Sequence, residues 1–290
     1  MESSDNLYSR KGLKDIEISA GKTGLEFASL SEDGRIEVLK SVEVSNPGFF
    51  NQLVRYTYGG YYTTPSPFGA AGDFFTSPMA HPSFGALIAV QLHRMWEILG
   101  FPGRFFVCEM GTGIGLLARD VVDLVAKTTT DFANALRYVA IERLSPKNPL
   151  LDHGDRTQWV TSSSLDLPVR DIVGCFLSNE LVDSFPVHRF VIRNGEIQEV
   201  YVTLDEQARL IEIIGEPSTV LINERLNDLD VTFPEGFRGE VRLNLGRWQA
   251  GVSDALAKGF VLTIDYGYEA AELYGSERSM GTLQTYYRHT

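Results

Sequence analysis

From residue 105 onward, short apolar runs alternate with segments whose apolar positions recur every three or four residues. The runs predict five β-strands: Phe105 to Glu109, Tyr138 to Glu142, Trp159 to Ser162, Ile172 to Ser178 and Phe260 to Asp265. Between the first two, residues 116–127 and 132–136 have the periodicity of amphipathic helices. Strands that alternate with helices are typical of a mostly parallel sheet covered on both faces. The pattern therefore predicts an α/β fold.

The chain ahead of this alternation has a different character. Residues 1–47 are polar and charged, which predicts a tail or a peripheral hairpin. Residues 49–82 are rich in glycine and aromatic residues, which is typical of a packed loop rather than a linker. From Pro82 to Leu99 apolar residues recur at helical spacing and Gly100 follows, so we expect one long helix there. We accordingly place one domain over residues 48–290.

An insert separates the last two predicted strands. Two apolar runs flank Asn194-Gly195, a pair that favours the positive φ angles of a type I′ hairpin turn. We expect residues of about 188–245 to form a β-hairpin insert that makes a side layer or cap.

Composition and charge exclude several classes of protein. The 290 residues are 43% hydrophobic, which is enough for a folded core, and 26 basic against 38 acidic residues give a net charge of -12. That charge disfavours binding to a nucleic-acid backbone and favours cationic partners. Cys108 and Cys175 lie in apolar runs, as buried thiols do. With no basic leader and no long apolar run, we expect a soluble protein in a reducing, cytoplasmic compartment.

A glycine loop follows the first predicted strand. Glu109 ends the strand, and Gly111, Gly113 and Gly115 have the spacing G-x-G-x-G before the next helix. Glycines let the backbone approach a ligand closely, and Glu109 can act on a cationic group. The arrangement resembles motif I of class I S-adenosylmethionine-dependent methyltransferases, whereas Leu116 departs from the dinucleotide-binding pattern. Taken alone, it is equally compatible with a purely structural turn.

Two further candidates follow the next predicted strands. Glu142 ends the second strand, where an acid can accept both hydroxyls of an adenosyl ribose; the alternative is a solvated carboxylate. Ser164 and Leu165 follow the third strand and could border an adenine, but the signal is weak, and taken by themselves they are better explained by a polar loop. All these residues lie at carboxyl ends of strands, where open α/β sheets bind ligands.

An acidic cluster follows the fourth predicted strand. Asn179, Glu180 and Asp183 lie just beyond it, and on a helical turn Glu180 and Asp183 would share a face. Two carboxylates can hold a guanidinium group, whose pKa exceeds about 12, and accept the proton it releases. The alternative is a helix cap, with Asn179 as N-cap. Asp265 ends the fifth strand and should neighbour this cluster. The five histidines show no metal-ligand spacing, so we expect no metal.

Several separated segments together resemble the MidA-like methyltransferases, whose eukaryotic members are mitochondrial complex I assembly factors. The matching segments are Gly60-Tyr61-Tyr62, residues 72–78 with Phe84-Gly85, residues 109–113, residues 178–190, residues 264–267, and Gly281-Thr282-Leu283 with His289. The resemblance implies a Rossmann-like class I methyltransferase sheet that binds S-adenosyl-L-methionine. For eukaryotic members it implies symmetric dimethylation of an arginine in a complex I subunit, in the mitochondrial matrix. It also implies that Glu109, Gly111, Gly113 and Glu142 hold the cofactor, and that Asp73, Asn179, Glu180 and Asp183 face the acceptor.

The chain departs from that family in four places. Met79 stands where an acid is common, Thr112 and Ile114 replace the usual Pro and Arg, and Glu142 is one residue further than usual from Ser145-Pro146. The residues after Gly267, from 268 to 290, are too few for the family's last helix and strand pair, so we expect a truncated chain or an abbreviated fold.

Three functions follow from these observations. We expect a protein-arginine methyltransferase first. A non-catalytic assembly factor or binding module that keeps the fold is the second hypothesis, and a small-molecule methyltransferase is the third, because the acceptor pocket cannot be derived from sequence.

Overall fold

The structure is a computed structural model that describes residues 22, 38, 41, 75–128, 130–143, 146, 149–151, 154–205 and 209–283. Its elements in chain order are α4 (Ser77–Ala80), α5 (Ser83–Ile98), β1 (Phe105–Met110), α6 (Leu116–Thr128), α7 (Thr130–Ala135), β2 (Leu136–Glu142), β3 (Thr157–Thr161), β4 (Ile172–Asn179), β5 (His188–Arg193), β6 (Glu196–Leu204), β7 (Leu210–Gly215), α8 (Val220–Asn227), β8 (Arg238–Val241), α9 (Asn244–Ala255), β9 (Leu256–Ile264), α10 (Ala270–Leu273) and a 3-10 turn, η4 (Ser276–Arg278). No helix among these is long and apolar enough to cross a membrane.

The chain divides into two compact units, which are described separately. One comprises residues 68–197 and 217–290 and holds the parallel sheet; the other comprises residues 1–67 and 198–216. In the smaller unit, β6 and β7 pair antiparallel, with Val200 opposite Ile214.

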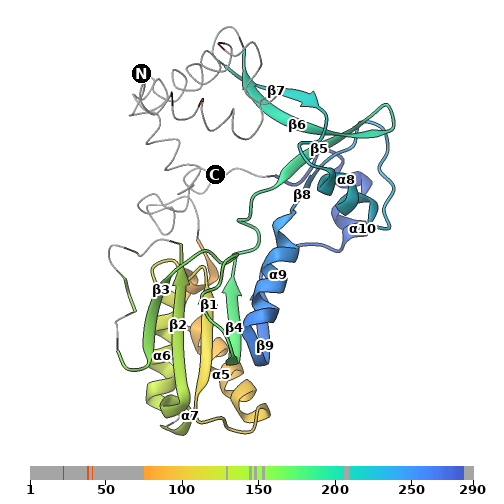
Figure 1. Cartoon of the computed structure of the whole chain (residues 1–290). Coiled ribbons are helices and arrows are strands. Elements are labelled where there is room, and N and C mark those ends of the chain that lie inside the picture. The colour runs from red at the N-terminus through yellow and green to blue at the C-terminus, as the bar shows by residue number, and fades with distance from the viewer. Residues whose placement is uncertain are drawn as a thin grey trace. The chain divides into compact units, whose positions relative to one another are not determined.

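Five parallel strands in the order β3-β2-β1-β4-β9 form the sheet of the larger unit (Figure 1). The register places Met110 of β1 opposite Ser178 of β4, and Asn179 of β4 opposite Ile264 of β9. This arrangement confirms the predicted α/β class. It also confirms that the strand ending before Asp265 neighbours the strand ending at Asn179.

Alternate residues of the buried strands enter two separate cores. On one face, Phe105 and Val107 pack with residues of α5, α6 and α7. On the other, Cys108 and Met110 pack with Trp248 and other residues of α9. Burial on both faces explains why β1 and β4 are nearly continuous apolar runs. It also leaves the carboxyl ends of these strands as the place where polar residues can gather.

Two strands begin earlier in the structure than the sequence predicts, because a helix passes directly into each of them. The strand β9 begins at Leu256 rather than Phe260, immediately after α9 ends at Ala255. The strand β2 begins at Leu136, immediately after α7 ends at Ala135. Neither junction has a glycine or proline, the residues that mark such boundaries in a sequence.

The predicted hairpin turn is confirmed within the insert. Strand β5 ends at Arg193, Asn194 and Gly195 have φ angles of 56° and 75°, and β6 begins at Glu196. Strand β5 also pairs antiparallel with β8, and a small core of aromatic and aliphatic side chains forms around Phe190. The insert contains β7, α8 and β8 in addition to the hairpin.

Several predictions concern residues outside the described ones. They include the tail or hairpin over residues 1–47, the aromatic loop up to residue 74 with Asp73, and His289. The domain boundary near residue 48 therefore stays a prediction.

Candidate functional site

The order of the strands creates a crevice between β1 and β4. The chain proceeds from β1 outward to β2 and β3, then returns to the other side of β1 with β4. The loops after β1 and β4 therefore leave in opposite directions, and ligands of open α/β sheets bind at this kind of reversal. A hollow of about 70 Å³ lies here, lined by α4, by the loop from Glu109 to Leu117, and by Asn179 and Glu180. The structure thus brings the predicted glycine loop and part of the acidic cluster together.

All three glycines of the loop have positive φ angles, 72° at Gly111, 60° at Gly113 and 83° at Gly115. A Cβ added to Gly113 would meet no atom within 4 Å, so its backbone faces open space. A Cβ on Gly111 would lie 2.8 Å from Leu181 Cδ1. Gly113 is therefore the position that a ligand can approach, whereas Gly111 allows the loop to pack against the segment after β4.

Glu142 is joined to the glycine loop by a hydrogen bond. Its Oε2 accepts from the Gly113 N–H at 2.7 Å, and its Oε1 accepts from the Arg143 N–H at 2.7 Å. Burial raises the pKa of Glu142, and these two backbone donors offset part of that rise. A carboxylate held in this way beside an open glycine is suited to accept hydroxyl groups of a ligand.

Glu109 lies deeper than the other acids, with only 3% of its surface exposed. Tyr138 donates its hydroxyl proton to Glu109 Oε2 at 2.8 Å. Burial raises the pKa of Glu109 to about 8. The hydrogen bond from Tyr138 lowers this pKa, but its effect is smaller than that of burial. The side chain is therefore mostly protonated at neutral pH and would ionise when a cation binds against it.

The segment after β4, residues 180–187, is not helical. The prediction that Glu180 and Asp183 share a helical face is therefore wrong. The alternative prediction, that Asn179 caps a helix, is wrong for the same reason. Glu180 has a φ of 48°, in the left-handed region. Its N–H donates to Ile264 O at 2.8 Å, and its Oε1 accepts from Ser77 N at 3.3 Å and Asn179 Nδ2 at 3.4 Å. Contacts with β9 and α4 fix Glu180 in a conformation that costs about 1 kcal/mol.

Asp265 organises the next residues of this segment. Its Oδ2 accepts from the N–H groups of Val182 at 2.9 Å and Asp183 at 3.2 Å, and its Oδ1 accepts from Tyr266 N at 2.9 Å. Burial, and then the charge of Asp183, raise the pKa of Asp265. Tyr266, which sequence reasoning missed, donates its hydroxyl proton to Asp183 Oδ2 at 2.5 Å.

Two acceptor oxygens of the cluster have no hydrogen-bond donor in the described part of the chain. They are Asn179 Oδ1 and Asp183 Oδ1, and both are buried. Buried acceptors without partners are uncommon, since each costs about 1–3 kcal/mol. Asn179 lines the hollow at the strand ends, whereas Asp183 does not. Both oxygens are able to accept from a ligand that carries N–H donors.

The remaining predicted residues lie elsewhere. Gly115 packs against Trp159, with which an added Cβ would make a contact of 2.9 Å. Leu165 packs against the core beneath α9, and neither it nor Ser164 lines the hollow. Their role in binding an adenine stays a prediction.

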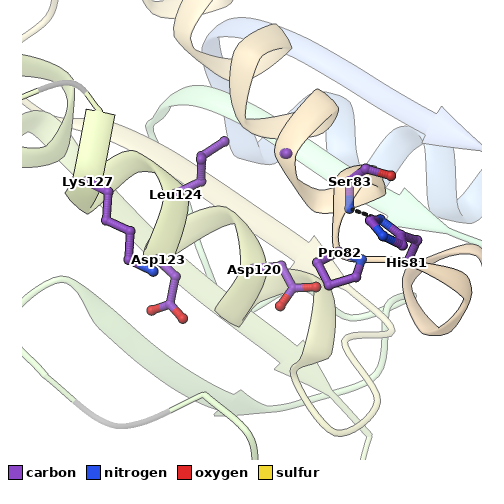
Figure 2. Close-up of a pocket in the computed structure, with 8 residues that line it drawn as sticks. His81, Pro82, Ser83, Asp120, Asp123, Leu124 and Lys127 are labelled. Carbon is purple, nitrogen blue, oxygen red and sulfur yellow. Dashed lines mark hydrogen bonds between the residues drawn. The ribbon is translucent and has the colours of Figure 1, made fainter.

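A larger hollow, of about 320 Å³, lies between the start of α5 and α6 (Figure 2). It is lined by His81, Asp120, Asp123 and Lys127 among others, and the labelled side chains come from helices and the turn before α5. None of them follows a strand. No group of three His, Cys, Asp or Glu among the described residues could hold a metal ion. The smaller hollow at the strand ends is therefore the candidate site.

Comparison with known proteins finds a matching family model and similar curated proteins. Residues 87–290 match the sequence model of a family described as "Putative S-adenosyl-L-methionine-dependent methyltransferase". The Drosophila melanogaster protein named protein arginine methyltransferase NDUFAF7 homolog, mitochondrial, is 28% identical over 204 residues, which are 63% of this chain and 47% of that protein. The human protein arginine methyltransferase NDUFAF7, mitochondrial, is 26% identical over 171 residues, 51% of this chain and 39% of that protein.

A solved structure is similar in fold. The Burkholderia thailandensis protein crystallised with S-adenosyl-homocysteine superposes with a TM-score of 0.69 at 24% identity, over 97% of this chain and 70% of that one. The chain spans about half the length, or less, of the curated relatives it matches.

Proposed function

The chain belongs to the S-adenosyl-L-methionine-dependent methyltransferase family whose sequence model it matches, and from that premise we propose that it methylates an arginine of a protein. The observation that carries the proposal is the pair of buried acceptor oxygens without donors, Asn179 Oδ1 and Asp183 Oδ1, beside the carboxylate of Glu180. A guanidinium group has five N–H donors and a fixed positive charge, and so matches them. The names of the curated relatives, protein arginine methyltransferases, support the same acceptor.

The residues around the crevice fit S-adenosyl-L-methionine as cofactor. Glu142 would accept the ribose hydroxyls, Gly113 would admit the ligand close to the backbone, and Glu109 would meet the cationic aminoacyl end. The hollow of about 70 Å³ is smaller than the roughly 300 Å³ of a typical ligand pocket. The open side of Gly113 supplies room for the rest of the molecule. When bound, the cofactor supplies an electrophilic methyl group on a sulfonium.

The chain's own contribution is to hold the acceptor and take its proton. Glu180 is fixed by hydrogen bonds from Ser77 N and Asn179 Nδ2, so it offers a preorganised carboxylate. Glu180 and Asp183 together can bind a guanidinium from two sides. The nitrogen that gains a methyl group loses one proton, and a carboxylate of this pair is the group that can accept it. Two acids are suited to this task because the unassisted guanidinium has a pKa above about 12.

Calorimetry with S-adenosyl-L-methionine, followed by transfer of a labelled methyl group to peptides, tests the proposal. We expect binding, and transfer to an arginine peptide but not to its lysine counterpart. Glu180→Gln should lower transfer at least 100-fold and change the cofactor dissociation constant less than twofold. Glu224→Gln, which removes an exposed acid on α8, is the matched control and should leave both unchanged.

The outcomes separate the hypotheses. Absence of cofactor binding would reject the proposal. Binding without transfer to any protein would favour a binding module, and transfer to small molecules alone would favour the third hypothesis.

The proposal extends to the acceptor protein and to the cellular compartment. The curated relatives are named mitochondrial, which supports the mitochondrial matrix for a eukaryotic chain. The cytoplasm, for a bacterial chain, stays a prediction from the sequence. A complex I subunit as acceptor stays a prediction from the resemblance. Methylation of extracts, with and without enriched complex I, would test it.

A further inference from the structure

The segment after β4 owes its shape to residues that follow β9. It forms no helix or strand, and Asp265 accepts hydrogen bonds from two of its N–H groups, those of Val182 and Asp183. The next residue, Tyr266, reaches the side chain of Asp183. Asp183 is thus held at its backbone by Asp265 and at its carboxylate by Tyr266.

We propose that Tyr266 is a positioning residue for methyl transfer, whose hydroxyl holds Asp183 Oδ2 and thereby fixes the direction of the buried, unpaired Oδ1. This inference rests on the proposed function of the site. The inference is based on the difference between the two carboxylate oxygens of Asp183. Oδ2 accepts from the Tyr266 hydroxyl at 2.5 Å, whereas Oδ1 has no donor in the described part of the chain. A carboxylate fixed at one oxygen presents the other in a single direction.

The hydrogen bond, rather than core packing, determines where the Tyr266 side chain lies. The residue is 71% exposed, so its ring contributes little to the hydrophobic core. Removal of the hydroxyl alone should therefore leave the fold intact. Tyr268, two residues later, offers a matched control because it is 53% exposed and its ring lies 3.8 Å from the guanidinium carbon of Arg278, a contact that phenylalanine preserves.

The charges around the Tyr266 hydroxyl keep it protonated. Burial, the hydrogen bond to Asp183, and the charges of Glu180 and Asp265 all raise the pKa of Tyr266 well above its ordinary value. Arg242 also contacts Asp183, since its Nη2 donates to the main-chain oxygen of Asp183 at 3.2 Å. The Tyr266 hydroxyl accordingly remains a hydrogen-bond donor at neutral pH.

Kinetics of Tyr266→Phe provide the first test. We expect kcat for transfer to an arginine peptide to fall about tenfold, while the cofactor dissociation constant and the thermal midpoint match those of the wild type. Tyr268→Phe should leave all three values unchanged. A parallel loss of cofactor affinity and thermal stability in Tyr266→Phe would overturn the inference, because it would indicate a structural role; an unchanged kcat would also overturn it.

Hydrogen exchange provides a second test that does not depend on activity. In Tyr266→Phe we expect amide exchange of a peptide covering residues 180–185 to accelerate roughly tenfold, with no change in Tyr268→Phe. Equal exchange in wild type and Tyr266→Phe would show that Asp183 is not held by this hydroxyl. If the wild type transfers no methyl group, the proposed function fails, and the exchange experiment still decides whether Tyr266 orders the segment.

Discussion

Replacement of Glu109 by glutamine should stabilise the protein increasingly as the pH rises. In the folded state burial raises the pKa of Glu109 to about 8, against an ordinary value of 4.5. A carboxyl group whose pKa is raised by folding is protonated more in the folded than in the unfolded chain between these two values. Its contribution is therefore fully favourable below pH 4.5 and is lost as the pH rises through 8. Glutamine is neutral throughout and keeps an oxygen to accept from Tyr138.

The magnitude follows from the two pKa values. Each pH unit between them corresponds to about 1.4 kcal/mol, so the full difference has an upper limit of about 5 kcal/mol above pH 8. We expect Glu109→Gln and wild type to have similar free energies of unfolding near pH 4.5. The variant should be more stable by about 3 kcal/mol at pH 7.

Urea unfolding at pH 5, 6, 7, 8 and 9, followed by tryptophan fluorescence, measures this difference. The three tryptophans, Trp96, Trp159 and Trp248, all lie in the unit that holds Glu109. Glu224→Gln, the same chemical change at an exposed position, should show no such pH dependence. A difference between Glu109→Gln and wild type that stays constant from pH 5 to 9 would refute the reasoning.

Three further predictions concern the crevice. Gly113→Ala should lower the free energy of unfolding by about 1 kcal/mol, because the φ angle of Gly113 is 60°, and thermal melts measure this effect. The same change should lower cofactor affinity at least tenfold in calorimetry, because the added methyl group enters the open space beside Gly113. Glu142→Gln should weaken cofactor binding about tenfold in calorimetry, since one of its two acceptor oxygens becomes an NH₂ group. Asp265→Asn should accelerate hydrogen exchange at Val182 and Asp183, whose N–H groups lose a charged acceptor.

The position of the site was predictable because it depends on strand ends. Glu142 and Asn179 end their strands, and Glu109 is the last residue but one of its strand. Each strand is recognisable from its apolar run, and parallel strands place their carboxyl ends at one edge of the sheet. The open backbone of Gly113 agrees with the glycine spacing. These features are local in sequence, so a pattern of a dozen residues contains them.

The internal geometry of the acidic cluster was not predictable, because distant residues impose it. An asparagine followed by acids favours a helix start locally, yet Glu180 is left-handed because Ile264 O binds its N–H. The donors from Ser77 to Glu180 and from Tyr266 to Asp183 span 103 and 83 residues. The helix α9 was missed for another reason: its buried Trp248, Val252 and Ala255 have helical spacing, but they follow a segment interpreted as insert.

The arrangement of acids explains how a protein of net charge -12 tolerates so many of them at one edge of a sheet. Burial keeps Glu109 protonated, while Glu142 receives two backbone donors and Asp265 receives three. Within the acidic cluster after β4, the buried oxygens Asn179 Oδ1 and Asp183 Oδ1 have no donor in the described part of the chain. A ligand that donates hydrogen bonds to these two oxygens would remove the cost of leaving them unpaired. Under the proposed function, arginine analogues should raise the thermal midpoint of the protein more than uncharged analogues of the same length.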